Sequence, residues 1–356
     1  MARAHRDRLH IRTDSLATRV LYAENGRACG VEWREGRHLY RASPVPSDQF
    51  GTVRRASARR EVILAGGAFA TPQLLTLSGI GDPDELARHG IPLRQALPAV
   101  GRNLQDRYEV SVVLKMAQPW VSLRGARFAA GDPLFQLWQR CRRGMYTSNG
   151  TAIAALRRSA TAPGSSADLV LMGLMGRFRG YYPGYAQDTW PGLDGFSWVV
   201  LKGRTGNRAG TVTLASADPR DPPVIAFRNF AEHGDADLAA LVEGIGMARQ
   251  LAQVMTEGGA AEQEETPGAA VTGAALRQWA HDNAWGHHAC GTAAIGEVLD
   301  ARGRVHGVAG LRVVDAAIFP RIPGLFIVAA IYFAAEKLAQ DILEDAARAA
   351  VPVMET

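Results

Sequence analysis

The end of the chain carries the pattern that most constrains its fold. Two adjacent histidines, His287 and His288, come shortly before Gly291. Farther along, an apolar run is stopped by Asp315, as expected of a short buried strand. Apolar residues at helical spacing then fill residues 331–347. A histidine, a strand that ends at a carboxylate and a closing helix favour a catalytic end over a structural tail.

Residues 60–81 predict a second compact pattern, a strand followed by a helix. A short buried strand is expected first, and the glycine pair Gly66-Gly67 is expected to form the turn. Thr71 before Pro72 predicts the start of the helix, because a threonine hydroxyl caps helices and proline suits the first helical position. Many α/β proteins contain such a segment, so this pattern alone does not define a function.

Short turns and a capping residue define the neighbouring elements. Residues 16–22 and 28–33 alternate or cluster apolar side chains around a turn at Gly26, which predicts a β-hairpin. Asp82 before a proline predicts a capped helix over residues 84–90. These elements indicate a mixed α/β fold at the start of the chain.

The composition changes between residues 107 and 282, where tryptophan and tyrosine alternate with glycine and proline. Strand-like runs at 167–172, 196–201 and 210–214 predict a sheet, and residues 235–255 predict a helix. We therefore expect a separate module here, with wide loops and an aromatic lining. The aromatic residues concerned are Trp120, Trp138, Tyr146, Tyr181, Tyr182, Tyr185, Trp190 and Trp198.

The charge and cysteine content argue against several classes of protein. The 40 Lys and Arg against 35 Asp and Glu give a formal net charge of +5, spread along the chain, which argues against nucleic-acid binding. The cysteines Cys29, Cys141 and Cys290 fit neither a disulfide framework nor a metal-binding spacing. We therefore predict no metal site and expect a reducing, cytoplasmic location. No apolar window is long enough for a membrane span.

Two of these segments resemble the glucose-methanol-choline (GMC) family of FAD-dependent alcohol oxidoreductases. The first runs from Gly67 to Gly81 and contains the runs Pro-Gln-Leu-Leu and Ser-Gly-Ile-Gly. The second begins at His288 and reads His-Ala-Cys-Gly-Thr. The resemblance implies oxidation of a small-molecule alcohol to an aldehyde or ketone, by hydride transfer to N5 of the flavin.

The resemblance also implies a division of the chain into domains. Residues 1–106 would form part of an FAD-binding domain of the α/β (α+β) class, and residues 283–356 would return to it. Residues 107–282 would form a substrate-binding domain with an antiparallel sheet and helices.

By the same resemblance, His288 is the catalytic base. Alcohol oxidation removes a proton from the hydroxyl while a hydride leaves the carbon, and an imidazole with a pKa near neutrality is suited to accept that proton. His287 is the fallback.

Four residues are placed at the FAD by resemblance. Asp315 and Ala316 would lie beside the flavin. Ala329 would stand at the start of the closing helix, whose N-terminus would stabilise the anionic reduced flavin. The backbone near Ala17 would contact the adenine.

The first departure from the family concerns the substrate oxygen. Family members usually place a second His or Asn after the Asp-Ala strand, and counting without gaps puts that position at Val328. No His or Asn occurs from Ala317 to Lys337. The apolar residues there, Phe326 among them, indicate a less polar alcohol than a sugar.

The second departure is that no G-x-G-x-x-G turn occurs in the sequence. In this family that turn holds the FAD pyrophosphate at a helix N-terminus. We therefore expect an N-terminally truncated family member that binds FAD weakly or not at all alone. The alternative is a non-catalytic remnant, or a subunit that needs a partner chain to supply the pyrophosphate site. A serine hydrolase is disfavoured because G-x-S-x-G is absent, and the motifs specify neither electron acceptor nor oligomeric state.

Overall fold

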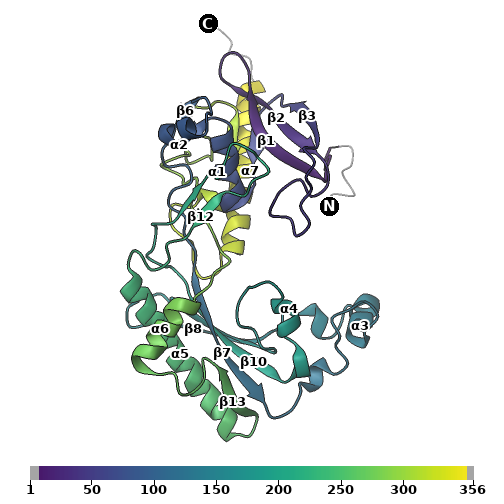
Figure 1. Ribbon diagram of the computed structural model, residues 1–356, viewed down its shortest axis with the longest axis vertical. Helices are drawn as coiled ribbons and strands as arrows, with labels where there is room; N and C mark the ends of the chain where they lie inside the picture. The colour runs from purple at the N-terminus through teal and green to yellow at the C-terminus, as the bar shows by residue number, and fades with distance from the viewer. Residues whose placement is uncertain (1–7, 351–356) are drawn as a thin grey trace.

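A computed structural model describes residues 8–350 of the chain. Its helices and strands gather in two parts, named upper and lower after their places in Figure 1. The lower part consists of β7 (Tyr108–Met116), α3 (Pro133–Cys141), β8 (Thr151–Arg157), β9 (Leu169–Leu174), α4 (Tyr185–Asp188), β10 (Gly195–Lys202), α5 (Gly234–Glu257), β13 (Ala261–Thr266) and α6 (Gly273–Asn283). The upper part consists of β1 (Ser15–Tyr22), β2 (Ala28–Glu35), β3 (Thr52–Ser57), β4 (Val62–Leu64), α1 (Gly67–Leu77), β5 (Ile80–Gly81), α2 (Pro83–Arg88), β6 (Gln95–Ala96), β11 (Thr211–Thr213), β12 (Val224–Ala226), β14 (Leu311–Val313) and α7 (Ile327–Ala350).

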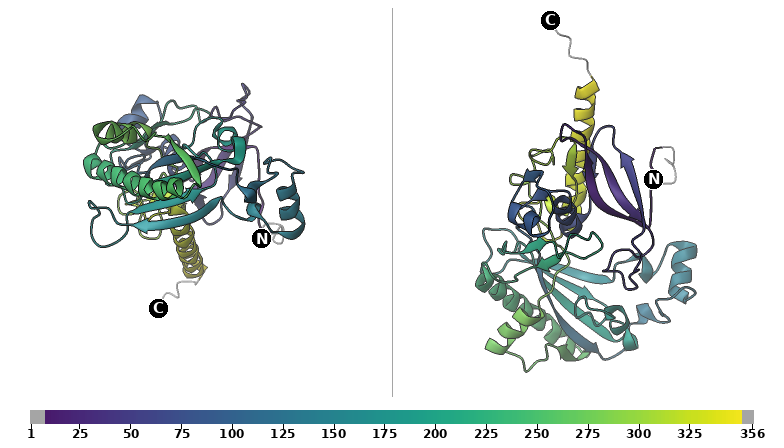
Figure 2. Two further views of the ribbon diagram at one scale, coloured as in Figure 1. Left: turned by 90° about the horizontal axis from the view of Figure 1, so that it is seen from below. Right: turned by 45° about the horizontal axis from the view of Figure 1, so that its top comes forward.

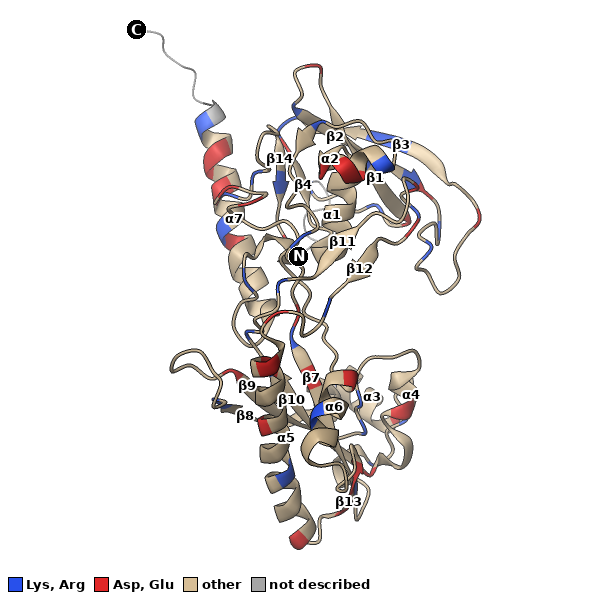
Figure 3. Ribbon diagram, turned by 60° about the vertical axis from the view of Figure 1, so that its left-hand side comes forward, with Lys and Arg blue, Asp and Glu red and all other residues tan. Residues whose placement is uncertain are grey.

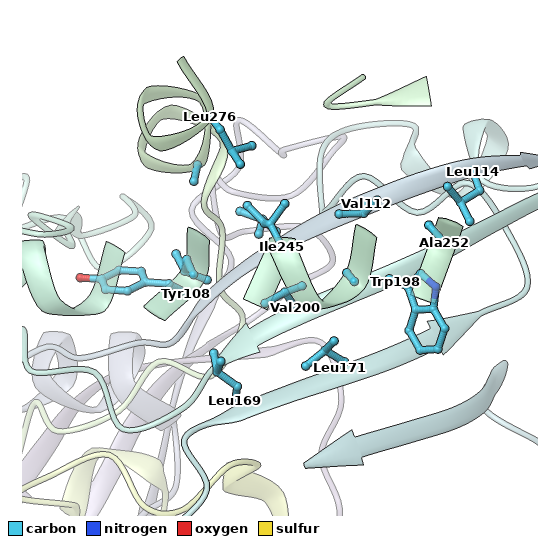
Figure 4. Close-up of a cluster of buried hydrophobic side chains, with 14 of the residues drawn as sticks. Tyr108, Val112, Leu114, Leu169, Leu171, Trp198, Val200, Ile245, Ala252 and Leu276 are labelled. Atoms are coloured by element: carbon cyan, nitrogen blue, oxygen red, sulfur yellow. The ribbon is translucent and has the colours of Figure 1, made fainter. Parts of the chain in front are cut away.

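The lower part is built on one antiparallel sheet of five strands, in the order β13-β7-β10-β9-β8. α5 packs on this sheet, and α6 packs against α5 (Figure 1). Side chains of the sheet, such as Val112 and Val200, meet Ile245 of α5 and Leu276 of α6 in a buried core (Figure 4). β7 and β10 are buried at nearly every position because they are central strands rich in apolar residues.

The sequence predicts this sheet only in part. Two predicted strands are confirmed as β9 and β10, and the predicted helix is confirmed as α5. The expectation that residues 210–214 join the same sheet is wrong, because β11 pairs with β12 in a separate ladder that packs on α1. The central strand β7 was missed, although Val110, Val112 and Leu114 alternate in it as strand residues do.

The upper part combines a three-stranded antiparallel sheet, β1-β2-β3, with a two-stranded parallel sheet of β4 and β14. The predicted hairpin is confirmed as β1 and β2, and Asp82 caps α2 by accepting from the backbone N–H of Asp84. A second core, distinct from that of the lower part, contains Val62, Leu75 of α1 and Leu338 of α7.

The sequence predicts that α1 begins at Pro72, but the helix begins at Gly67. The carboxylate of Asp315 accepts hydrogen bonds from the backbone N–H of Gly67 at 2.9 Å and from the Thr71 hydroxyl at 2.6 Å. A side chain far along the sequence therefore caps the helix, and Thr71 lies inside it. Gly67 has a φ of +77°, which glycine adopts without strain.

α7 begins at Ile327, before the predicted range 331–347, and projects beyond the body of the upper part (Figure 2). Its C-terminal half is tied to the parallel sheet by ion pairs. The guanidinium of Arg312 in β14 is 2.6 Å from the Asp345 carboxylate of α7 and 2.7 Å from that of Glu61.

Lys and Arg lie among Asp and Glu over both parts of the chain (Figure 3). This agrees with a net charge that is spread along the sequence. No helix within residues 8–350 has the length and apolar character needed to cross a membrane.

Candidate active site

His288 lies on the segment that leaves α6 and returns to the upper part. This segment runs antiparallel to the stretch before and at the start of β7. Glu109 and Trp285 exchange backbone hydrogen bonds of 2.8 and 3.0 Å, and Gln105 and Cys290 exchange two of 3.0 Å. The two pairs fix the backbone on either side of His288.

Asp106 holds the histidine from the opposite segment. Its Oδ1 accepts hydrogen bonds from the backbone N–H of His288 at 2.8 Å and from that of Arg107 at 2.7 Å. The Arg107 guanidinium donates to the carbonyl oxygens of Pro323 and Gly324, at 2.7 Å each. The loop that leads into α7 is thereby joined to the same segment.

The imidazole of His288 faces the carboxylate of Glu109. Nδ1 of His288 is 3.4 Å from Oε1 of Glu109, and Nδ1 of His287 is 3.5 Å from the same oxygen. His288 and Glu109 are 5% and 1% exposed, whereas His287 is exposed. Sequence reasoning missed Glu109, and the only signal for it was a lone carboxylate within a run of apolar strand residues.

Burial sets the charges of these groups. It lowers the pKa of His288 to about 4, with a further contribution from the Arg107 guanidinium, so the imidazole is neutral at neutral pH. Burial raises the pKa of Glu109 to about 7 and that of Asp106 to about 6. The neutral imidazole is the form that can accept a proton.

Aromatic rings surround the two histidines. Between ring centroids, His287 is 4.8 Å from Tyr181 and 5.8 Å from Trp285. The ring of His288 is 5.7 Å from that of Phe326. One wall of the site is therefore apolar and aromatic.

The predicted aromatic lining is divided between different places. Tyr181 lies at the histidines, but Trp138, Tyr146 and Trp190 line an apolar cavity of about 520 Å³ whose lining includes neither histidine. Trp198 is part of the core under α5. Only some of these residues are thus placed to shape a pocket at His288.

Asp315 and Ala316 lie next to the histidine segment. The carbonyl oxygen of Ala316 accepts a hydrogen bond from the backbone N–H of Gly291 at 3.2 Å. Burial raises the pKa of Asp315, and its carboxylate also accepts from the backbone N–H of Ala317 at 2.7 Å. Since its other hydrogen bonds cap α1, Asp315 shapes this region by positioning that helix.

The start of α7 lies close to the same segment, because its first residue, Ile327, packs with Cys290. Val328 and Ala329 follow in the first turn and are exposed. Ala17, the fourth expected cofactor residue, is exposed in β1. In the ladder of β1 and β2 it lies opposite Trp33.

Asp315, Ala316 and the first turn of α7 fit the flavin end of an FAD. The first turn of α7 contains no acidic side chain, so the positive end of its dipole is free to stabilise an anionic ring system. The pyrophosphate end has no matching G-x-G-x-x-G turn in the sequence.

Family comparisons match both ends of the chain. A family model described as GMC oxidoreductase matches residues 1–109, and a second with the same description matches residues 206–335. The chain therefore belongs to the GMC oxidoreductase family, as its motifs predict. FAD is the cofactor of this family, and the predicted mixed α/β fold is confirmed.

Individual relatives agree with this assignment. An oxygen-dependent choline dehydrogenase of Klebsiella pneumoniae is 34% identical over 89% of this chain and 54% of its own length. A glucose methanol choline oxidoreductase of Aspergillus terreus is 31% identical over 94% of this chain and 54% of its own length. A solved formate oxidase of Aspergillus oryzae, studied for the modification of its FAD, has a TM-score of 0.78 at 26% identity, over 93% of this chain and 60% of that one. The chain spans about half the length of the curated relatives it matches.

Proposed function

We propose that the chain acts in FAD-dependent oxidation of an alcohol to an aldehyde or ketone, with His288 as the general base. The observation that carries this proposal is the buried imidazole of His288, on a segment that Asp106 holds at the His288 backbone and that meets Ala316 at Gly291. FAD supplies the hydride acceptor when it is bound. The side chains of the protein orient the alcohol and take up its proton.

Glu109 orients the imidazole in this scheme. Its carboxylate is 3.4 Å from Nδ1 of His288, which favours the tautomer with the proton on Nδ1. Nε2 then keeps its lone pair and accepts the hydroxyl proton of the alcohol. Glu109 is a positioning residue, because it acts through His288.

The cofactor contacts are proposed from the same arrangement. Asp315 and Ala316 would border the flavin, and the first turn of α7 at Ala329 would offer its backbone N–H groups to the cofactor. The backbone at Ala17 contacts the adenine. The exposure of Ala329 and Ala17 leaves both positions accessible to a ligand.

A weakly polar alcohol is the proposed substrate. Phe326 and Val328 are 43% and 56% exposed, and the Phe326 ring contacts His288. Choline, named for the Klebsiella relative, is the second candidate, because the carboxylate of Glu109 and the rings of Tyr181 and Trp285 suit a cation. Comparison of the rates at which apolar primary alcohols, choline and sugars reduce the flavin decides between the two candidates.

Single-turnover reduction of the bound flavin tests the role of His288. The chain is saturated with FAD, mixed anaerobically with alcohol and followed by the loss of flavin absorbance. His288→Gln is expected to slow reduction by about 100-fold or more, the usual contribution of a general base. His281→Gln is the control, because His281 is exposed on α6 beside Asp282. Equal rates in wild type and His288→Gln would reject the proposal.

A second candidate function is that of a subunit whose partner polypeptide supplies the pyrophosphate site. Within residues 8–350, β4 and β14 form a parallel sheet of two strands, whereas parallel sheets are normally larger and covered on both faces. Ile63 of β4 is 45% exposed, and Tyr332 and Phe333 of α7 are 71% and 79% exposed. Large apolar side chains exposed in this way usually mark an interface.

The partner polypeptide would carry strands that extend this sheet and a glycine-rich turn. A cleft of about 990 Å³ beside the sheet is lined by apolar side chains such as Ile63 and Leu311 and by charged ones such as Arg60 and Arg304. Titration of the chain with FAD separates the two candidates. Stoichiometric binding by the chain alone would reject the second one. Binding that requires an added dinucleotide-binding segment of a choline dehydrogenase would favour it.

A further inference from the structure

Three side chains of the candidate site offer metal-ligand atoms that face one another. They are His287, His288 and Glu109, and one imidazole nitrogen of each histidine and one oxygen of the carboxylate all lie within 4.8 Å of one another. Among the residues that the structure describes, no other group of three or more His, Cys, Asp or Glu has this arrangement. The backbone hydrogen bonds between Glu109 and Trp285 hold the two segments in place.

The distances suit a shared metal ion better than hydrogen bonds. Oε1 of Glu109 is 3.4 Å from Nδ1 of His288 and 3.5 Å from Nδ1 of His287. Hydrogen bonds between such atoms are usually ~2.7–3.2 Å long. Zinc ligands at ~2.0–2.1 Å in tetrahedral geometry are about 3.3–3.4 Å from one another. Two edges of the tetrahedron are nearly formed, and the third, between one nitrogen of each imidazole, is no longer than 4.8 Å.

Two of the three ligand atoms have no other partner. Nδ1 of His288 and Oε1 of Glu109 are buried, and neither forms a hydrogen bond within the described residues. Buried polar atoms are nearly always paired, so two facing atoms without partners require an explanation. One cation between them would satisfy both.

The surrounding charges and the access to solvent also permit a divalent cation. The carboxylates of Asp106 and Glu109 oppose the charge of the Arg107 guanidinium, which donates to two backbone carbonyls. The side chain of His287 is 39% exposed. A fourth ligand, such as water, can therefore reach the ion from the His287 side.

We propose that Glu109, His287 and His288 bind one divalent transition-metal ion of the Zn²⁺ class. Two imidazole nitrogens and a carboxylate oxygen form a donor set that zinc uses in proteins, with water in the fourth position. Mg²⁺ and Ca²⁺ prefer oxygen ligands and do not fit this set.

A bound ion also changes the chemistry of His288. An imidazole that ligates through Nδ1 carries its proton on Nε2, so it no longer accepts one there. Bound zinc therefore inhibits alcohol oxidation, a consequence that rests on the proposed function. The sequence predicts no metal site because the cysteine spacing gives no signal and the three ligands come together only through the pairing of distant segments.

Calorimetric titration of the FAD-free chain with Zn²⁺ tests the site, and one ion per chain is expected. His287→Ala and Glu109→Gln are each expected to weaken binding by at least about tenfold, since even the outer partners of metal ligands contribute that much. His287 is exposed, so His287→Ala removes a ligand without disturbing the buried core. His281→Ala is the matched control, because His281 lies 2.8 Å from Asp282 in another histidine–carboxylate pair.

The outcomes separate a built site from surface binding. Lack of stoichiometric Zn²⁺ binding, unchanged affinity in His287→Ala, or an equal loss of affinity in His281→Ala would each overturn the site. The titration needs neither FAD nor alcohol, so it fails or succeeds independently of the proposed function. In the FAD-loaded chain, one equivalent of Zn²⁺ is expected to slow flavin reduction in wild type and not in His287→Ala. Unslowed reduction with zinc bound would reject the inhibitory role.

Discussion

The hydroxyl of Thr292 donates a hydrogen bond of 2.7 Å to the carbonyl oxygen of Ala68 inside α1. In an α-helix that oxygen would accept from the backbone N–H four residues later, but Pro72 occupies this position and has no N–H. Thr292 therefore supplies the donor that the proline lacks. A buried hydrogen bond thus joins the two segments by which the family is recognised.

Replacing this threonine measures the contact. Thr292→Val keeps the shape of the side chain but leaves a buried carbonyl without its donor, which is expected to lower the free energy of unfolding by about 1–3 kcal/mol. Denaturant titration gives the value. Thr256→Val is the control, because its exposed hydroxyl bonds Ala252 within α5, and a change within ~0.5 kcal/mol is expected there. Equal losses would show that the Ala68 contact contributes nothing of its own.

The cap of α3 is expected to weaken in acid. Burial pushes the pKa of Asp132 upward, but hydrogen bonds from the Tyr146 hydroxyl at 2.5 Å and the Phe135 backbone at 2.6 Å outweigh it and lower the pKa to about 2. Because this folded-state value is below the usual one of about 3.9, the stabilisation is present above pH ~4 and is lost as the pH falls towards 2.

Comparison of wild type with Asp132→Ala tests the sign of this dependence. The difference in unfolding free energy is expected to be ~1 kcal/mol at pH 6, as for other helix caps, and to shrink as the pH approaches 2. Asp48→Ala, at an exposed position outside any helix, serves as the control. A difference that grows in acid would contradict the assignment.

Arg312 is expected to be the most sensitive residue of the ion pairs that anchor α7. Its side chain is 3% exposed and joins Glu61 to Asp345. Arg312→Met leaves two carboxylates without their shared partner, so a loss of about 3 kcal/mol in unfolding free energy is expected. Arg348→Ala removes an exposed pair at 3.8 Å and is expected to change it by less than ~0.5 kcal/mol. Similar losses in both variants would contradict a special role for β14.

An amide side chain introduced at position 328 is expected to donate a hydrogen bond to the substrate oxygen and to speed flavin reduction. Val328 lies exposed in the first turn of α7, where the side chain of an asparagine has room. A hydrogen bond to a charge that develops during reaction corresponds to about 10–100-fold in rate, so Val328→Asn is expected to speed flavin reduction to that extent. Phe333→Asn, farther along the same helix, is the control. No acceleration would remove Val328 from the proposed substrate pocket.

Local signals in the sequence predicted the elements whose causes are local. The hairpin of β1 and β2 and the capped helix α2 depend on turns and on Asp82, and both are confirmed. The start of α1 was predicted wrongly because the group that caps it, Asp315, is distant in sequence. The strand β11 was placed in the wrong sheet for a similar reason, since its partner was not legible from its own residues.

The candidate site follows the same division. His288 was recognisable from its spacing to Gly291, which is a local motif. Glu109 was not, because a glutamate in a strand acquires a role only when the histidine segment pairs with it through Trp285. The motif therefore located the proposed base, whereas the carboxylate that faces it became visible only through the pairing of distant segments.

His288 and Glu109 belong to two paired segments by which the chain passes between its upper and lower parts. The proposed base thus stands at a junction and not within either body. A small twist of one part against the other would tilt the imidazole and alter its reach towards a substrate. The proposed reaction therefore depends on the stiffness of this connection, and variants at Gln105 or Trp285 are expected to change turnover while leaving both cores intact.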